Sequence, residues 1–167
     1  MKPSRPTVVY DANVLYPAQL RDFLMWVGVN KLVEAHWTES IQHEWMRNLL
    51  ANRDDLTEQD LAYTRQQMER ALPQACISGH SDWIEDLTLP DPDDRHVLAA
   101  AIHANADAIA TINLDDFPEK RLSIYGISPI HPDQLVCTLF DRCPDEVIAT
   151  VADHRATLTD PEKSPDE

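Results

Sequence analysis

The sequence predicts an α/β fold, in which one domain is built on a central, mostly parallel β-sheet flanked by helices. Two apolar runs of strand length, Thr7–Tyr10 and Ala108–Ile112, are separated by long segments with helical periodicity. The expected order of strand, several helices, strand, helix, strand and helix is typical of α/β proteins. Acidic residues follow both runs closely, at the carboxyl ends of strands where such folds place their sites.

In the first half of the chain, apolar spacing and capping residues define the elements. Leu20, Leu24 and Val27 share one helical face, and Thr57 is a favourable N-cap for a helix that Pro73 ends. The expected elements are a buried strand at Thr7–Tyr10, a helix at Gln19–Lys31, a brief turn at Ala35–Thr38, a helix at Glu39–Asn52, a helix after Thr57 and a short strand at Ala75–Ile77.

In the second half, a rigid acidic turn at Pro90–Asp94 precedes a helix whose apolar residues include Val97 and Leu98. Ala108–Ile112 is the best candidate for a central strand, and Ile124–Ile130 contains a further strand candidate. Two closing helices are expected at Pro132–Phe140 and Pro144–Leu158, the second with a half-stripe of Val147, Ile148 and Val151. The polar end of the chain predicts a disordered tail.

Composition limits the size and the class of the protein. With 167 residues and 43% hydrophobic content, the chain suits one well-buried domain. No apolar run approaches 18 residues, so no membrane span is expected, and the first six residues lack the apolar stretch of a signal peptide. Cys76, Cys137 and Cys143 are odd in number and lack metal-binding spacing, which indicates reduced thiols in a cytoplasmic protein.

The net charge of −15 comes from 29 acidic and 14 basic residues. A protein of this charge repels nucleic acid at long range, which counts against a high-affinity DNA-binding module. The charge counts less against an enzyme whose acidic pocket meets phosphate through a metal ion. A basic protein partner or selection for solubility would also explain it. With only three glycines, the chain has no phosphate-cradling loop.

Four short acidic segments carry the candidate chemistry: Tyr10–Asn13, Gln42–Trp45, Pro90–Arg95 and Asn113–Phe117. Carboxylates gathered in one pocket repel each other, so the cluster makes sense mainly around a cation. Hard oxygen ligands of this kind suit Mg²⁺ or Mn²⁺. The sequence therefore predicts a metal-dependent enzyme that acts on phosphates.

Each candidate ligand has an alternative structural explanation. Asp11 could cap the following helix, and Glu44 could be a solvated partner of Arg47. In the third segment Asp94 ranks first and Asp93 second, because Asp94 lies one turn before the apolar residues of its helix.

The fourth segment and its neighbours complete the expected site. Asp116 is preferred to Asp115 because it adjoins the apolar Phe117. Asn13 is expected to orient Asp11 or touch substrate, and Thr111 and Asn113 are expected to add supporting polar contacts.

At these residues the chain resembles the PIN-domain ribonucleases, in particular the VapC-type toxins of bacterial toxin–antitoxin pairs. The matching pieces are Val9–Leu15, Glu44 in its helix, Asp94–Ala101 and Thr111–Phe117. The resemblance implies a PIN-like fold with a nuclease domain over residues 1–140, a C-terminal helical extension over residues 141–158 and a disordered tail over residues 159–167.

The resemblance also implies an acidic pocket in which Asp11, Glu44, Asp94 and Asp116 bind one or two Mg²⁺ or Mn²⁺ ions. The ions would lower the pKa of a water and hold the scissile phosphate of an RNA substrate. A cognate antitoxin encoded nearby would be the protein partner. A homodimer is a further expectation, because relatives commonly pair and Trp26, Trp37 and Trp83 exceed the apolar residues that one sheet obviously needs.

Two other functions remain open at this point. A PIN-like fold that no longer cleaves could serve only as a binding partner, although a dead site tends to lose carboxylates that repel each other. A haloacid-dehalogenase-like phosphatase would also place an aspartate after its first strand, at Asp11. That chemistry needs a second aspartate where this chain has Asn13.

Overall fold

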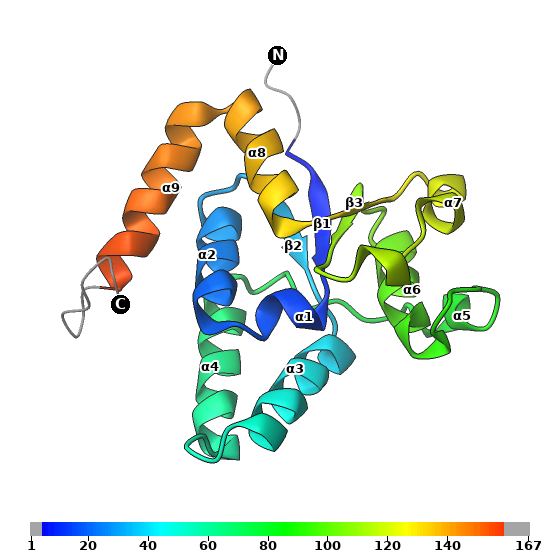
Figure 1. The fold of residues 1–167 in the computed structure, drawn as a ribbon, viewed down its shortest axis with the longest axis horizontal. Helices are drawn as coiled ribbons and strands as arrows, with labels where there is room; N and C mark the ends of the chain where they lie inside the picture. Colours follow the sequence, from blue (N-terminus) through cyan, green and yellow to red (C-terminus); the bar gives the residue numbers. More distant parts are fainter. Residues whose placement is uncertain (1–4, 159–167) are drawn as a thin grey trace.

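The computed structural model describes residues 5–158, and in them the chain forms a parallel sheet with helices on both sides (Figure 1). The strand order is β2-β1-β3-β4, and all three neighbouring pairs run parallel. The strands are β1 (Thr7–Tyr10), β2 (Glu34–His36), β3 (Ala108–Ala110) and β4 (Ser128–Ile130). The predicted α/β fold with a central parallel sheet is confirmed.

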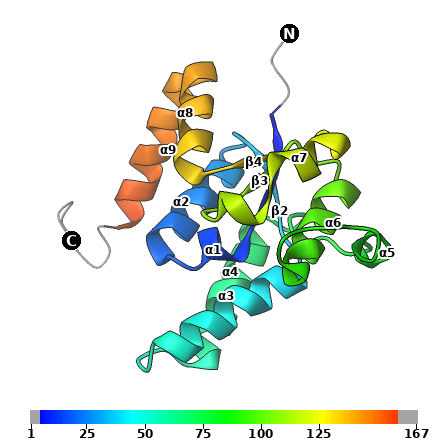
Figure 2. The same cartoon turned by 45° about the vertical axis from the view of Figure 1, so that its right-hand side comes forward.

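Helices make up most of the remaining described chain. The α-helices are α1 (Ala12–Leu15), α2 (Ala18–Val29), α3 (Glu39–Asn52), α4 (Glu58–Ala71), α5 (Ser81–Ile84), α6 (Arg95–His103), α7 (Glu119–Leu122), α8 (Pro132–Arg142) and α9 (Pro144–Thr157). Three short 3₁₀ helices are η1 (Pro92–Asp94), η2 (Leu114–Asp116) and η3 (Ser123–Tyr125). In both views α2 and α6 lie on opposite sides of the sheet (Figures 1 and 2).

The two inner strands, β1 and β3, are buried on both faces. Val8, Val9 and Tyr10 of β1 are fully buried, and so is Ile109 of β3. Continuous apolar runs of this kind are typical of inner strands in parallel sheets. The Tyr10 hydroxyl donates to the carbonyl of Leu24 at 3.0 Å, which ties β1 to α2.

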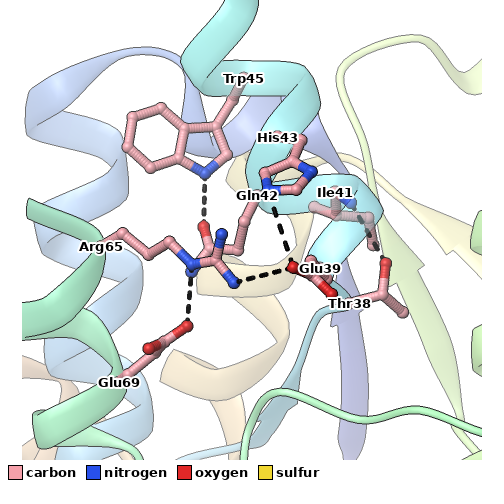
Figure 3. A network of polar contacts seen from close by, with 8 residues as sticks. All are labelled: Thr38, Glu39, Ile41, Gln42, His43, Trp45, Arg65 and Glu69. Atoms are coloured by element: carbon pink, nitrogen blue, oxygen red, sulfur yellow. Dashed lines mark hydrogen bonds and ion pairs between the residues drawn. The ribbon is translucent and has the colours of Figure 1, made fainter. Parts of the chain in front are cut away.

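Helix α3 is held in place by caps and ion pairs at its N-terminal half (Figure 3). The Thr38 hydroxyl accepts the N–H of Ile41, as expected for an N-cap. Arg65 of α4 lies 3.9 Å from the carboxylate of Glu39 and 2.9 Å from that of Glu69, so it links α3 to α4. The predicted cap of α4 is also present, since Thr57 and Asp60 form a reciprocal capping box.

Several elements differ from the sequence-based expectations. The turn expected at Ala35–Thr38 is wrong, because Glu34–His36 pairs with β1 as the edge strand β2. Ala75–Ile77 is not a strand, since only Cys76 forms a single bridge, to Trp37. The central strand ends at Ala110 rather than Ile112, and the chain turns into α1 directly after Asp11, where no helix was expected.

At the C-terminal end, α9 packs against α2 and α8. Asn30, the residue that follows α2 and caps its C-terminal end, donates from its amide to the Thr150 hydroxyl and to Asp153, both at 3.0 Å. Of the expected apolar stripe only Val147 is buried, whereas Ile148 and Val151 are exposed. The tail predicted at residues 159–167 lies outside the described residues.

Two further expectations concern surfaces. Trp37 is fully buried in the core, so it cannot support the expected homodimer, whereas Trp83 is 43% exposed and Trp26 is half-buried. The domain boundaries at residues 140 and 158 stay predictions. Among residues 5–158, no helix combines the length and hydropathy that a membrane crossing requires.

Candidate active site

The candidate site begins where β1 and β3 end side by side. The two strands are hydrogen-bonded neighbours, and the Asp11 N–H continues their pairing by donating to the Ala110 carbonyl at 3.0 Å. Asp11 and Thr111 are therefore the first residues beyond the two inner strands. Parallel strands thus bring to one edge two residues that lie 100 positions apart in the sequence.

Asp11 is only 5% exposed, and three hydrogen bonds hold its carboxylate in one orientation. Its Oδ1 accepts the N–H of Ala12 at 2.8 Å. Its Oδ2 accepts the Thr111 hydroxyl at 3.0 Å and the Asn13 amide at 3.2 Å. Burial raises the pKa of Asp11, and the bonds from Thr111 and Ala12 oppose that rise. Asp11 therefore caps α1 through Oδ1, and its Oδ2 is bound by Thr111 and Asn13.

Asn13 and Thr111 form a fixed polar bridge beside Asp11. The Asn13 amide nitrogen also donates to the Thr111 hydroxyl at 3.0 Å, and its amide oxygen accepts the N–H of Ile112 at 3.1 Å. The N–H of Asn113 donates to the Thr111 hydroxyl at 3.2 Å. Asn113 takes part only through its backbone N–H, and the supporting role expected for the three polar residues stays a prediction.

Four carboxylates from four separate segments line one cavity of about 420 Å³: Asp11, Glu44, Asp94 and Asp116. Asp91, Asp93 and Asp115 do not line it, and Asp93 and Asp115 are exposed. Asp91 instead caps η1 by accepting the Asp93 N–H at 2.9 Å. The structure thus brings together the four residues that the sequence ranked first, although their role as ligands stays a prediction.

The four carboxylates influence each other electrostatically. Burial and then the charges of Asp11 and Asp116 raise the pKa of Asp94 to about 7, with smaller contributions from Asp91 and Glu44. For Glu44, burial and then the charge of Asp11 raise the pKa, while Arg47 lowers it. Within residues 5–158 no ion pair joins Glu44 to Arg47, so the alternative of a solvated pair is not realised.

The chemistry of the cavity fits a hard divalent cation. Carboxylate and amide oxygens dominate the polar side chains that line it, and none of its described lining residues is lysine or arginine. The repulsion that raises the pKa of Asp94 therefore has no positive side chain within the cavity to relieve it. In the part of the chain that the structure describes, no three acidic, histidine or cysteine side chains are already gathered around one ion position. The carboxylates would have to draw closer together on binding.

Three further lining residues extend the cavity beyond the carboxylates: Tyr16, Asn48 and Asn52. Asn48 and Asn52 follow Glu44 at four and eight residues, so one face of α3 carries all three. That four-residue spacing can be read from the sequence once Glu44 is placed at the site. Nothing in the local sequence marks Tyr16, because it reaches the cavity only through the packing of α1 on α3.

Comparisons with known proteins support the same family as the acidic motifs. A family model described as PIN domain matches residues 7–115, a range that starts at β1 and ends one residue before Asp116. A curated relative, "Putative ribonuclease VapC50" of Mycobacterium tuberculosis, is 36% identical over 72 residues. That alignment covers 43% of this chain and 43% of the relative, less than half of its length. No solved structure matches the chain.

Proposed function

Because the chain belongs to the PIN-domain family, we propose that it is a metal-dependent endoribonuclease that hydrolyses phosphodiester bonds in RNA. One observation carries the proposal: Asp11, Glu44, Asp94 and Asp116 line one cavity without a positive side chain among its described lining residues. The relative whose name includes ribonuclease supports RNA as the substrate class. The cofactor would be Mg²⁺ or Mn²⁺, since both prefer oxygen ligands.

In this proposal, the residues of the chain prepare the site before substrate arrives. Asp11 is the most constrained carboxylate, because Thr111, Asn13 and the Ala12 N–H hold both of its oxygens. Glu44, Asp94 and Asp116 surround the same space from α3, η1 and η2. A bound divalent cation supplies Lewis acidity and charge neutralisation at a phosphate. Phe117 is fully buried and anchors η2, which keeps Asp116 at the cavity.

The proposal extends to the biological role. We expect the protein to be the toxin of a type II toxin–antitoxin pair, with an antitoxin encoded nearby and with RNA as the target in the cytoplasm. The net charge of −15 favours a basic antitoxin surface, because opposite charges steer association.

The two alternative functions gain no support from the geometry. A phosphatase of the haloacid-dehalogenase type would need an acid at position 13, but the Asn13 amide is bound by Asp11, Thr111 and the Ile112 N–H. An inactive PIN-like binding protein has no need to gather four carboxylates in one cavity. Such a protein would show no RNA cleavage under any metal condition.

Replacing Asp11 with asparagine tests the proposal. Asp11→Asn keeps the size of the side chain but removes the charge that would hold the cation, so RNA cleavage should be lost while the fold persists. Glu44→Gln and Asp94→Asn should behave alike, and their effects should not add, because the residues act as a unit. Asp115→Asn is the matched control, since Asp115 is exposed and lies outside the cavity.

The measurement is cleavage of total cellular RNA with Mn²⁺ or Mg²⁺, run beside growth after induced expression. Circular dichroism verifies that each variant is folded. The proposal predicts cleavage and growth arrest for the parent and Asp115→Asn only. If Asp11→Asn cleaves RNA and arrests growth as the parent does, the metal-nuclease assignment is wrong.

A further inference from the structure

The cavity continues along α3 beyond the carboxylates as a wall of amides. Glu44, Asn48 and Asn52 follow each other at four-residue steps, and each step advances about 6 Å along a helix. Tyr16 and Pro17, at the junction of α1 and α2, line the same cavity. The volume of about 420 Å³ lies within the range of small-molecule sites, roughly 300–1,000 Å³. The cavity thus has two ends. The carboxylates line one end, and the amides of Asn48 and Asn52 with the ring of Tyr16 line the other.

The aromatic end is held firmly by a buried cation. Arg21 is only 7% exposed, and its Nη1 donates to the carbonyls of Leu15 at 2.8 Å and Tyr16 at 3.4 Å. The guanidinium of Arg21 lies 4.5 Å from the ring centre of Trp45 on α3. It therefore joins the C-terminal end of α1 to α3. The backbone at Tyr16 is therefore tied to α3, which carries the amide wall, before any ligand binds.

The side-chain amides of Asn48 and Asn52 differ in the hydrogen bonds that they already form. Asn52 donates from its amide nitrogen to the Tyr16 hydroxyl at 3.2 Å. Asn48 is exposed, and no hydrogen bond of its side chain occurs among the described residues. An asparagine amide offers two donor hydrogens and one acceptor oxygen. Asn48 thus presents an unused donor and acceptor pair to the cavity.

We propose that Tyr16, Asn48 and Asn52 form a subsite for one unpaired nucleobase of the RNA substrate, next to the four carboxylates. The inference rests on the proposed function, since the base belongs to the RNA that would be cut. Aromatic side chains stack on unpaired bases, and an asparagine amide can form two hydrogen bonds with an adenine edge. Among the described lining residues there is no lysine or arginine, so no positive side chain at this end of the cavity would bind a phosphate in place of a base. The discriminating contacts here are therefore to a base.

This subsite also defines the form of RNA that fits. Bases inside an A-form duplex are stacked and face a groove that side chains cannot read, whereas unpaired bases can be splayed onto aromatic and amide groups. The protein should select single-stranded loops or ends and should show a base preference beside the cut. Adenosine monophosphate is the nucleotide expected to bind tightest.

Calorimetry with nucleotides that contain no phosphodiester bond tests the subsite separately from cleavage. The full chain in Mn²⁺ is titrated with the 5′- and 3′-monophosphates of adenosine, cytidine, guanosine and uridine, and with inorganic phosphate. The parent should bind the preferred nucleotide at least about fivefold more tightly than the weakest one. Asn48→Leu should remove that preference, and Tyr16→Ala should weaken all nucleotides by about 5- to 150-fold. Both variants should bind inorganic phosphate as the parent does.

Gln134→Leu on the exposed surface of α8 is the matched control for an amide-to-apolar change, and it should keep the preference. Equal affinities of the parent for all four bases, or an unchanged preference in Asn48→Leu, would overturn the subsite. Mapping of cut sites on RNA separates the two proposals. If the protein binds bases selectively but shows no Mn²⁺-dependent cleavage, the subsite stands and the nuclease proposal is rejected. If the protein cleaves RNA and Asn48→Leu keeps the same site preference, the nuclease proposal stands and the subsite is rejected.

Discussion

Replacing Asp94 with asparagine should stabilise the metal-free protein at pH 8 and leave it unchanged near pH 4. The pKa of Asp94 rises from its ordinary value of 3.8 to about 7 in the folded protein. The folded state therefore binds more protons than the unfolded state between these values, so the stability of the parent falls as the pH rises through this range. Near pH 4 the carboxyl is protonated in the folded state and about half-protonated in the unfolded state, so asparagine offers little advantage.

The size of the effect follows from the pKa shift. A rise from 3.8 to about 7 corresponds to at most about 4 kcal/mol at pH 8. Asp94 is half-buried, and solvent screening of its exposed part reduces that figure to about 1–2 kcal/mol. The gain should reverse when cation is present, since a ligand at 100 times its dissociation constant stabilises the parent by about 2.7 kcal/mol.

Urea unfolding followed by tryptophan fluorescence measures the difference, because Trp37 and Trp45 are both fully buried. Parent and Asp94→Asn are compared in EDTA at pH 4 and pH 8, and again at pH 8 with Mn²⁺. Asp115→Asn is the control for loss of one negative charge, and its effect should stay within about 0.5 kcal/mol. Equal urea midpoints of parent and Asp94→Asn in EDTA at pH 8 would refute the electrostatic coupling. A gain that is as large at pH 4 as at pH 8 would refute its assignment to ionisation.

The remaining predictions concern cation binding and assembly. Mn²⁺ or Mg²⁺ should raise the melting temperature of the parent, and the Mn²⁺ affinity measured by calorimetry should increase between pH 6 and pH 8, because Asp94 must lose its proton to bind. Identical melting curves in EDTA and in millimolar Mn²⁺, together with no binding heat, would contradict this. A homodimer is expected in solution, and light scattering that gives a monomer mass at tens of micromolar would count against it.

Much of the fold could be predicted from the residues of the inner strands and of the helix caps. Thr7–Tyr10 was predicted with the bounds that the structure has, because a short, continuous apolar run is the local signature of a strand buried on both faces. Glu39–Asn52 was equally clear, since its apolar residues follow a helical period, and the structure adds Thr38 as its cap. The ranking of Asp94 over Asp93 also relied on local information, namely the distance to the apolar face of α6.

Other elements depended on contacts that no local pattern contains. Glu34–His36 carries two polar residues and is a strand because it pairs with Thr7–Val9 of β1. Trp37, expected at a surface between two copies, is in the core, where its ring lies 6.4 Å from that of Tyr10. The place of Tyr16 at the cavity also depends on tertiary contacts, which Arg21 and Asn52 make with it.

The sequence by itself determined which carboxylates were available and at which ends of strands and helices they would lie, because those positions follow from short-range periodicity and capping. Only the tertiary structure decided that Asp11, Glu44, Asp94 and Asp116 share one cavity. The charge of each acts on the others across the chain, and the raised pKa of Asp94 is the sum of burial and of neighbours up to 83 positions away in the sequence. Electrostatic energy depends on distance in space, and folding sets that distance.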